Sequence, residues 1–406
     1  MSKTLYFFTR HYPYHEHGEA FIEREILFLS KEFEKIIIFP SNKHKYCRKV
    51  PVNVTVNDLF IDNTASFSSG FTLYIQNFFL LLITVLTEIK SKGISNFFKN
   101  IEKYLRLLLI QLIRYDRMKK FLEEKNETIE IAYDYWFINS TLALCYLKKE
   151  GFIDKLITRS HKMDVFDEVQ KDTGIPFRNY QIELIDKMYT ISHFNKNYFK
   201  NKFREDLIDK ISVSYLGVKN GPLSKQAFPN SDIKVIVSCA NMHEHKNIHL
   251  IPETLKNVKT KVKWIHFGKG DFYSKVEEQI KELPDNVTVE LKGSVLNETI
   301  IKFYSEQQVD LFLSLSSSEG IPVSMMEAMA NNIPILAYAI DGVPEIVVDN
   351  ITGKLFYNIN NFQEIAQFID ESLAREFNKD KIKSYFLENF HESDKYEKFA
   401  KEIASL

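Results

Sequence analysis

Residues 314–356 read SLSSSEGIPVSMMEAMANNIPILAYAIDGVPEIVVDNITGKLF. The stretch begins at the end of an apolar run, DLFLSLS at 310–316, and contains a second apolar run, PILAYA at 334–339. Residues 322–331 lie between the two runs and fit a helix. A buried strand, a helix and a second buried strand in this order predict a βαβ unit of a parallel sheet.

The same alternation continues upstream of this stretch. Val, Ile and Leu occur there in runs without polar alternation, which is typical of parallel strands that are covered on both faces. The connections between the runs are short, as such units require. We expect strands at 234–240, 262–268 and 287–293, and helices at 247–257, 271–282 and 297–307.

The N-terminal half shows the alternation less regularly. A strand at 4–9, a helix at 21–33 and a strand at 35–40 form a first βαβ unit. Residues 71–125 are expected to be mostly helical. Further strands are expected at 130–137, 155–160, 188–193 and 210–218.

These elements predict an α/β protein with two Rossmann-like, doubly wound domains. The domains are expected at 1–212 and 213–390, with a terminal helix at 391–406 that packs back on the first domain. The 406 residues are enough for two sizeable cores. Two such domains would face each other across a cleft, where the C-terminal ends of their strands meet and ligands bind.

The composition is that of an ordinary globular protein, with 45% apolar and 26% charged residues. The formal net charge of -1 provides no overall field that would attract nucleic acid. The three cysteines, Cys47, Cys145 and Cys239, are far apart and indicate neither a disulfide framework nor a thiolate metal site. We therefore expect a cytoplasmic protein without a nucleic-acid partner.

Residues 71–120 allow two interpretations. The apolar stretch at 71–87 is interrupted by Gln76 and Asn77 and is shorter than the roughly 20 apolar residues that a spanning helix needs. From 88 to 120 there are nine Lys or Arg residues against three acidic ones. Such a basic amphipathic region can lie on the inner face of an anionic membrane. Equally, its apolar faces can pack on the domain core.

Glycine is scarce, with 13 residues in the chain, and six of them fall between 268 and 353. Five of these lie at or just past the end of an expected strand, where a ligand can approach the backbone. Ordinary strand-to-helix turns explain any single one equally well. The five are Gly268, Gly270, Gly293, Gly320 and Gly342.

Two glutamates flank the start of the helix expected at 322–331. Glu319 lies in the loop before it and Glu327 lies within it. Gly320 allows a tight turn, and Pro322 suits the first helical position. The N-terminus of a helix attracts an anion such as phosphate, and carboxylates accept hydrogen bonds from sugar hydroxyls.

The sequence EGIP, with a second Glu eight residues after the first and EAMA following, resembles the signature of retaining glycosyltransferases of family four, the glycosyl transferases group 1. The resemblance implies the GT-B fold. It continues through IPILAYAIDGVPEIV and NITGKLF, and upstream through VSCANMHEHKNIHLI, VKWIHFGKGD and NVTVELKGSV. In the N-terminal half, TRHYPYHEHGEAFIEREILFLSKEF and TRSHKMDVFDE resemble members that act in capsule, exopolysaccharide and lipopolysaccharide synthesis.

The resemblance assigns roles to individual residues. Glu319 would contact the hydroxyls of the donor sugar and help to stabilise the transition state, and Glu327 would bind the nucleotide ribose. Lys246 would face the donor diphosphate, and His161 would be the active-site histidine near the donor sugar. The other donor-binding residues implied are Gly18, Asn241, Lys292, Ser294, Gly320, Ile321, Pro322 and Val323.

Asn241 is a departure from the family pattern, because many relatives carry arginine there. Neutralisation of the diphosphate would then depend more on Lys246 and the helix N-terminus. No two aspartates lie two positions apart, whereas a D-x-D motif holds the metal in the other common transferase fold. We therefore expect no metal, and His243, His245 and His249 have no Cys or Asp in the motif to complete a ligand set.

The resemblance implies a metal-independent hexosyltransferase that needs no cofactor. It would transfer a sugar from a nucleotide-diphosphate sugar, expected to be a UDP-sugar, to a hydroxyl of a glycan or lipid-linked bacterial polysaccharide precursor. Two alternatives stay open: an inactive GT-B scaffold that binds nucleotide or a partner, and a nucleotide-sugar epimerase or phosphorylase of similar fold. A dinucleotide-dependent dehydrogenase is disfavoured, since no G-x-G-x-x-G follows the first strand.

Overall fold

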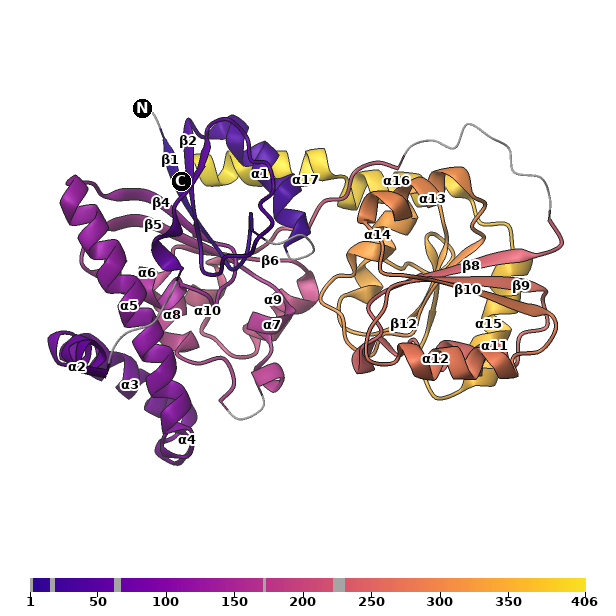
Figure 1. Cartoon of the computed structure of the whole chain (residues 1–406), viewed down its shortest axis with the longest axis horizontal. Helices are drawn as coiled ribbons and strands as arrows, with labels where there is room; N and C mark the ends of the chain where they lie inside the picture. The colour runs from indigo at the N-terminus through magenta and orange to yellow at the C-terminus, as the bar shows by residue number, and fades with distance from the viewer. Residues whose placement is uncertain (1–2, 15–18, 62–66, 171–172, 222–230) are drawn as a thin grey trace. The chain divides into compact units, whose positions relative to one another are not determined.

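Figure 1 shows the computed structural model of the chain, which describes residues 3–14, 19–61, 67–170, 173–221 and 231–406. The chain divides into two units, which are described separately below. The first unit contains residues 1–214 and 396–406, and the second contains residues 215–395.

A seven-stranded parallel sheet forms the centre of the first unit, in the order β3-β2-β1-β4-β5-β6-β7. Its long central strands are the uninterrupted apolar runs that the sequence indicates. The strands are β1 (Thr4–Thr9), β2 (Lys35–Pro40), β3 (Val54–Val56), β4 (Ile129–Asp134), β5 (Ile153–Ser160), β6 (Lys187–Thr190) and β7 (Ile211–Val213).

Helices cover both faces of this sheet, because successive side chains of a strand point to opposite faces. Leu5 and Phe7 of β1 pack with α1 (Ala20–Glu32) and with the end of α17 (Glu392–Ala404). Tyr6 and Phe8 point to the other face. That face is covered by α5 (Ile101–Lys125), α6 (Thr141–Lys149) and α8 (Arg178–Leu184).

The region expected to be helical consists of α2 (Phe67–Gln76), α3 (Phe78–Lys92), α4 (Ile94–Lys99) and α5. The three shorter helices gather near the N-terminal end of α5 (Figure 1). Within the described residues, no helix is both long and apolar enough to cross a bilayer. The remaining helices of the first unit are α7 (Lys162–Val165), α9 (His193–Lys200) and α10 (Glu205–Ile208), with short 3-10 turns η1 (Asp58–Phe60) and η2 (Asp167–Gln170).

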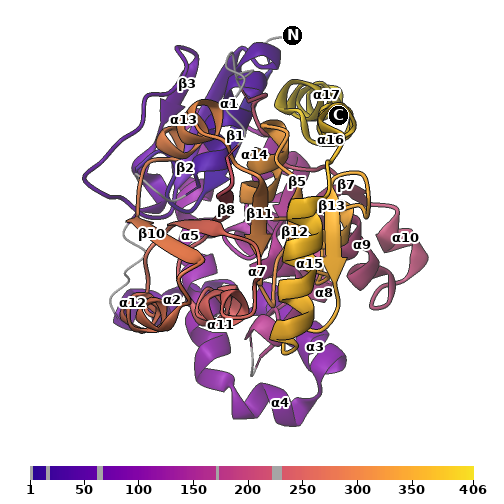
Figure 2. The ribbon, with the colours of Figure 1, turned by 90° about the vertical axis from the view of Figure 1, so that its right-hand side faces the viewer.

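The second unit contains a six-stranded parallel sheet in the order β10-β9-β8-β11-β12-β13. Figure 2 shows α15 lying along β12 and β13 on one face of this sheet. The strands are β8 (Lys234–Cys239), β9 (Val262–Phe267), β10 (Val287–Gly293), β11 (Leu311–Ser314), β12 (Ile335–Tyr338) and β13 (Gly353–Phe356).

The helices of the second unit occur between these strands and after them. They are α11 (Leu250–Leu255), α12 (Tyr273–Gln279), α13 (Asn297–Glu306), α14 (Val323–Ala330), α15 (Phe362–Ala374) and α16 (Lys379–Phe390), with 3-10 turns η3 (Glu244–Lys246), η4 (Ile280–Glu282) and η5 (Val343–Glu345). Two parallel sheets with flanking helices confirm the predicted α/β class.

Two local predictions were wrong, those for residues 210–218 and for Pro322, and two short strands were not predicted. The strand expected at 210–218 is reduced to Ile211–Val213. The strands β3 and β13 were not expected, since both are short and lie at the sheet edges. Pro322 is the N-cap of α14 rather than its first residue, with an extended ψ of 108°, so the helix begins at Val323.

Candidate functional site

Glu319 and Lys246 form an ion pair beyond the C-terminal ends of β11 and β8. The Nζ atom of Lys246 lies 2.6 Å from Oε1 of Glu319, and both side chains are largely shielded from solvent. The residues are 73 positions apart in sequence. The parallel sheet brings them together because β8 and β11 are neighbouring strands.

Hydrogen bonds between the two loops hold this pair in place. The backbone N–H of Ser317 donates to the carbonyl of His245 at 2.9 Å, and the amide of Asn247 donates to the carbonyl of Leu315 at 3.0 Å. Asn247 has a φ of 52°, a left-handed conformation that asparagine tolerates, and it ends η3 directly after Lys246. The position of the ammonium group is therefore set by backbone contacts and not by the ion pair alone.

Asp341 is a further component of the Glu319 loop that sequence reasoning missed. Its carboxylate accepts the backbone N–H of Glu319 at 2.9 Å, and its φ is 50°. The sequence places Asp341 only in a turn, and nothing in it identifies the distant backbone group that Asp341 binds. Gly320 follows Glu319 without a positive φ, so the tight turn expected there needs no left-handed residue at that position.

Glu327 lies on α14 in a buried and almost uncharged environment. Among the described residues, its carboxylate accepts one side-chain hydrogen bond, from the amide of Asn297 to Oε1 at 2.7 Å. Burial raises the pKa of Glu327 to about 7, while the bond from Asn297 acts in the opposite direction. The neighbouring Tyr304 hydroxyl has no hydrogen-bond partner within the described part of the chain. A buried carboxylate with such a shifted pKa is a candidate ligand-binding group.

The other predicted donor-binding residues of the loop before α14 lie next to Glu319 along the chain. Ile321 is buried, Pro322 caps the helix and Val323 is its first residue. Asn241 lies in the loop after β8 and is exposed. That loop is therefore shared by Asn241 and Lys246.

Close contact with the loop after β8 explains why positions 268 and 270 are glycines. A Cβ atom at Gly268 would lie 1.9 Å from the carbonyl oxygen of Ala240, and Gly268 has a φ of 137°. A Cβ atom at Gly270 would lie 2.9 Å from the backbone nitrogen of Met242. Both glycines allow the loop after β9 to pack on the loop that carries Lys246. A close backbone contact within the unit therefore accounts for them without a ligand.

Within the described residues, no hydrogen bond or ion pair joins Lys292 or Ser294 to the Lys246–Glu319 pair. Lys292 is exposed at the end of β10 and pairs with Glu290 of the same strand, which also binds Lys263 at 2.9 Å. Ser294 is exposed just after the strand. A role of these residues at the nucleotide base stays a prediction.

His161 lies in the first unit, at the C-terminal end of β5, where it is the N-cap of α7. Its ring packs among aromatic rings, with centroid distances of 4.2 Å to Trp136, 4.9 Å to Tyr135 and 5.7 Å to Phe21. Burial and then the charges of Arg159 and Arg10 hold the pKa of His161 well below its usual value. The imidazole is therefore neutral near pH 7.

Three residues around His161 were not identified from the sequence. The carboxylate of Glu19 accepts the backbone N–H groups of Arg10, His11 and Tyr12 at 3.1, 2.7 and 2.6 Å, and also binds the indole N–H of Trp136. The Arg10 guanidinium lies 4.7 Å from the centre of the Trp136 ring. Arg10, Glu19 and Trp136 thus surround the strand end that carries His161. Gly18, also predicted here, lies outside the described residues.

No group of three metal-ligating side chains occurs in the described ranges. Of the histidines considered as ligands, His243 bonds to Asp271 at 2.9 Å and His249 stacks on Phe272 with centroids 4.6 Å apart. His11 contacts His44 through their ring nitrogens at 3.1 Å, and His15 and His17 lie outside the described residues.

Comparison with known proteins identifies the fold of the chain and the family that residues 222–387 match. Residues 222–387, which include Lys246, Glu319 and Glu327, match the family model of the glycosyl transferases group 1. The part of the chain that carries Lys246 and the two glutamates is therefore similar to the group 1 glycosyltransferases. The match confirms the resemblance drawn from the sequence around the two glutamates.

Two curated relatives of this group 1 glycosyltransferase domain are similar over part of their length. The amylovoran biosynthesis glycosyltransferase AmsK of Erwinia amylovora is 29% identical over 127 residues, which are 30% of this chain and 31% of AmsK. The poly(glycerol-phosphate) alpha-glucosyltransferase of Bacillus subtilis is 29% identical over 158 residues, 37% of this chain and 22% of that protein. The matched stretches thus span less than a third of either relative.

Solved structures extend the similarity in fold to the whole chain. The lipopolysaccharide outer core galactosyltransferase WaaB has a TM-score of 0.70 at 15% identity and covers 99% of both chains. HepE of Anabaena, solved in complex with UDP, has a TM-score of 0.67 at 14% identity and covers 100% of both chains. At these identities the comparison establishes the GT-B fold.

Proposed function

We propose that this protein is a retaining, metal-independent glycosyltransferase of bacterial polysaccharide synthesis. It transfers a hexose from a nucleotide-diphosphate sugar, a UDP-sugar by our proposal, to a hydroxyl of a lipid-linked glycan precursor. The observation that carries this proposal is the fixed pair of Lys246 and Glu319 beside the buried Glu327, within the domain that matches the family.

The pair of Lys246 and Glu319 suits the two ends of a sugar diphosphate. The ammonium of Lys246 would bind the diphosphate, whose negative charge grows as the sugar–oxygen bond breaks, and would lower the barrier by stabilising that charge. Glu319 would exchange its ammonium partner for donor-sugar hydroxyls. Since Asn241 has no charge, Lys246 is the principal cation that the loop after β8 offers to the diphosphate.

Glu327 would bind the ribose of the donor nucleotide. Its carboxylate accepts one hydrogen bond, from Asn297, and so retains acceptor capacity for the ribose hydroxyls. Burial favours the protonated form of Glu327. The ionised carboxylate is the better hydrogen-bond acceptor, so binding of the donor favours loss of that proton.

His161 would contact the donor sugar as a neutral group. A neutral imidazole has one donating and one accepting nitrogen, and both ring nitrogens of His161 lack a hydrogen-bond partner among the described residues. In the proposed same-face mechanism, the acceptor hydroxyl attacks the anomeric carbon while its proton passes to the leaving diphosphate. The residues of the chain then act by positioning and electrostatic stabilisation.

A membrane-bound acceptor accords with the exposed apolar surface of α2–α4. Ten of the 21 large apolar side chains that are exposed in the described residues lie between 75 and 105. On α3, Leu81 and Thr84 are buried, while Phe79 and Leu86 on the opposite side are 77% and 55% exposed. A helix that is apolar on both sides needs a second apolar partner. We propose that this partner is the inner face of the cell membrane.

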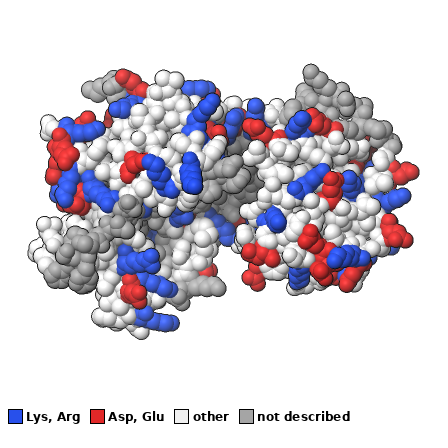
Figure 3. All heavy atoms as spheres, viewed as in Figure 1, with Lys and Arg blue, Asp and Glu red and all other residues white. Residues whose placement is uncertain are grey.

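Basic residues beside this surface favour an anionic membrane. Lys90 and Lys99 are exposed and have no ion-pair partner among the described residues. Acidic and basic side chains are otherwise interspersed over the face of the molecule shown in Figure 3.

The proposed activity is tested by calorimetry of the whole chain with UDP, GDP and common nucleotide sugars. Transfer is then assayed with the sugars that bind. We expect UDP binding and acceptor-dependent transfer with retained configuration. Sugar exchange or phosphorolysis without acceptor would contradict the proposal, as would nucleotide binding without any turnover across a panel of acceptors.

The proposed membrane contact is tested separately by flotation with anionic vesicles. The wild-type chain should float with the vesicles, and the double variant Phe79→Ser, Leu86→Ser should not. Val52→Ser is the matched control, since Val52 is fully exposed but lies outside α2–α4. Absence of the wild-type chain from the vesicle fraction would refute this part of the proposal.

A further inference from the structure

A cavity of about 600 Å³ lies in the first unit, between α5, α6, α8 and the loop formed by residues 165–170 and 173–177. None of the candidate donor-site residues that the structure describes lines it. The lining residues that carry its chemistry are Lys103, Arg106, Leu107, Ile110, Leu142 and Phe177.

The lining combines apolar walls with a basic rim. Of the thirteen lining residues within the described ranges, seven are apolar, two are cationic and none is acidic. The two cationic residues, Lys103 and Arg106, are both exposed, so they lie where the cavity meets solvent. Arg106 has no hydrogen bond or ion pair within the part of the chain that the structure describes. The rim therefore favours an anionic ligand group.

Polar side chains inside the cavity are already engaged with the protein. The amide of Gln111 donates to the carbonyl of Asn139 at 2.9 Å and accepts the backbone N–H of Ala143 at 3.2 Å. The Gln181 amide donates to the carbonyl of Pro176 at 3.0 Å. The apolar side chains, which make up seven of the thirteen described lining residues, suit a hydrocarbon chain better than a glycan.

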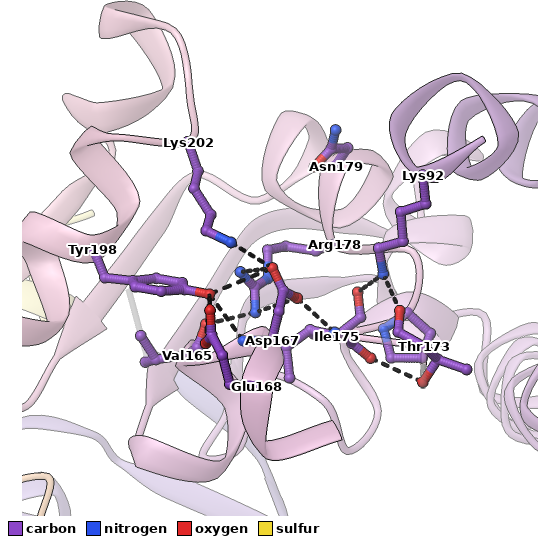
Figure 4. Close-up of polar contacts among 12 residues, drawn as sticks. Lys92, Val165, Asp167, Glu168, Thr173, Ile175, Arg178, Asn179, Tyr198 and Lys202 are labelled. Carbon is purple, nitrogen blue, oxygen red and sulfur yellow. Dashed lines mark hydrogen bonds and ion pairs between the residues drawn. The ribbon is translucent and has the colours of Figure 1, made fainter. Parts of the chain in front are cut away.

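The loop that forms one wall is fixed by contacts centred on Asp167 (Figure 4). Its carboxylate accepts the backbone N–H of Ile175 at 2.7 Å, binds Lys202 at 2.7 Å and pairs with Arg178 at 3.3 Å. These charged groups lower the pKa of Asp167 despite its partial burial. The wall is thus held without a ligand, which reduces the ordering that binding would require.

A second set of contacts ties the same loop to α3. The ammonium of Lys92 donates to the carbonyls of Thr173 and Ile175, at 2.7 Å each (Figure 4). Lys92 also pairs with Glu88 at 2.9 Å, and Glu88 accepts the backbone N–H of Phe177 at 2.9 Å. The wall of the cavity and the helix with the exposed apolar side are therefore one packed assembly.

Aromatic contacts connect the cavity to the exposed apolar surface. Phe177, in the cavity wall, meets Tyr104 with ring centroids 5.4 Å apart, and Tyr104 stacks on Phe97 at 4.9 Å. The adjacent Phe98 is 60% exposed. An amphiphile held by its tail in an apolar surface at α4 would have a short path to this cavity.

We propose that this cavity binds an anionic amphiphile, with its phosphate at Lys103 and Arg106 and its hydrocarbon chain along Leu107, Ile110 and Leu142. The ligand class that we propose is a lipid phosphate. The proposal goes beyond sugar transfer, because the cavity would bind a lipid phosphate of the glycosyl acceptor and one of the membrane in the same way.

The test is calorimetry of the whole chain with decyl phosphate below its critical micelle concentration. Inorganic phosphate and decyl maltoside are the comparison ligands. We expect decyl phosphate to bind about tenfold or more tightly than either, because it alone offers both the charge and the chain. Equal binding of decyl phosphate and decyl maltoside would overturn the proposal, and so would equal binding of inorganic phosphate.

Variants locate the binding in this cavity. The double variant Lys103→Gln, Arg106→Gln alters two exposed side chains and should keep the fold while losing about tenfold in decyl phosphate affinity. Leu107→Trp should fill the cavity and block the chain. Lys149→Gln, an exposed lysine on α6, is the control. Unchanged binding in the double variant would refute the site even if Leu107→Trp failed to fold. UDP binding, measured in parallel, should be the same in all variants.

Discussion

The ammonium of Lys246 lies 2.6 Å from a carboxylate oxygen of Glu319, so each of the two proposed donor-contacting charges is the other's counter-ion. The pair is mostly shielded from water, which strengthens the attraction and makes an unpaired charge costly. A donor diphosphate would replace the carboxylate as the partner of Lys246, and sugar hydroxyls would replace the ammonium as the partners of Glu319.

The first prediction concerns Lys246. Lys246→Met should reduce transfer by about a hundredfold or more, because the leaving diphosphate loses its cation. Steady-state kinetics and circular dichroism should show lost turnover with the fold intact. Lys281→Met is the matched control, because that exposed lysine pairs with Glu278 of the preceding turn and has no proposed role at the site. Comparable losses in both variants would contradict the special role of Lys246.

Glu319 should behave as one unit with Lys246. Glu319→Gln alone should also nearly abolish transfer, and the double variant Lys246→Met, Glu319→Gln should lose little more than the worse single variant. The measurement is a double-mutant cycle on kcat/KM. Losses that simply multiply would show that the two residues act independently.

The second prediction concerns the pH dependence set by Glu327. Its folded-state pKa of about 7 lies above the value of 4.5 for an exposed glutamate, so the folded state holds the proton more tightly. Glu327 therefore contributes roughly 3 kcal/mol to the free energy of unfolding below pH 4.5. This contribution is lost as the pH rises from 4.5 to about 7, so the free energy of unfolding slopes downward with pH over that range. Glu327→Gln should remove this slope from the unfolding free energy of the second unit.

The two tryptophans allow the pH dependence of the free energy of unfolding to be measured in one unit at a time. Trp136 belongs to the first unit and Trp264 to the second. In a Trp136→Phe background, urea unfolding followed by fluorescence should report the second unit with and without Glu327→Gln. If the free energy of unfolding changed with pH in the same way with and without Glu327→Gln, the result would be inconsistent with a raised pKa at Glu327.

The third prediction concerns the buried ion pair of Glu25 and Arg159. Nη2 of Arg159 lies 3.0 Å from Oε2 of Glu25, and both side chains are fully buried. Glu25→Ala should cost about 3–5 kcal/mol because it leaves a buried guanidinium without its counter-ion. Trp136 fluorescence in a Trp264→Phe background should report this loss. Replacing both residues, with Glu25→Leu and Arg159→Met, should recover most of it; equal instability of the single and double variants would count against the explanation.

The fourth prediction concerns His161 in acid. Because its folded-state pKa lies well below 6.5, the folded state binds fewer protons than the unfolded one below that pH. The contribution of His161 to stability is therefore present above pH 6.5 and declines as the pH falls below it. In His161→Phe, the free energy of unfolding should fall less steeply below pH 6.5, because phenylalanine does not titrate but keeps the ring packing. NMR titration of the wild-type imidazole near its usual pKa would rule the explanation out.

Much of the fold could be predicted because the central strands consist almost entirely of buried apolar residues. Runs such as KIIIFP at 35–40 and KVIVSC at 234–239 have few alternatives to a buried strand. The edge strand β13 could not be recognised in the same way. Its position depends on Gly353, where a Cβ atom would lie 1.8 Å from the carbonyl oxygen of Ile335. That is a contact between distant residues which a local pattern does not contain.

The candidate site was predictable by residue type but not by partner. The two glutamates and Lys246 could be named because their spacing matches a family signature. Their counter-ions and hydrogen-bond partners are separated from them by tens of residues, as for Asn297, 30 positions from Glu327, and Asp341, 22 positions from Glu319. Such residues come close in space only when the strands that precede them pair in the correct register.

The discontinuity of the first unit has a consequence for synthesis on the ribosome. Phe399 and Ile403 of α17 are buried in the core that β1 and α1 form, yet they are translated after the entire second unit. Residues 215–395 can therefore complete a core during translation, whereas one sheet face of the first unit stays only partly covered, by α1, until residues 396–406 emerge. A nascent chain stalled before residue 396 should bind chaperones through its earliest residues rather than its latest.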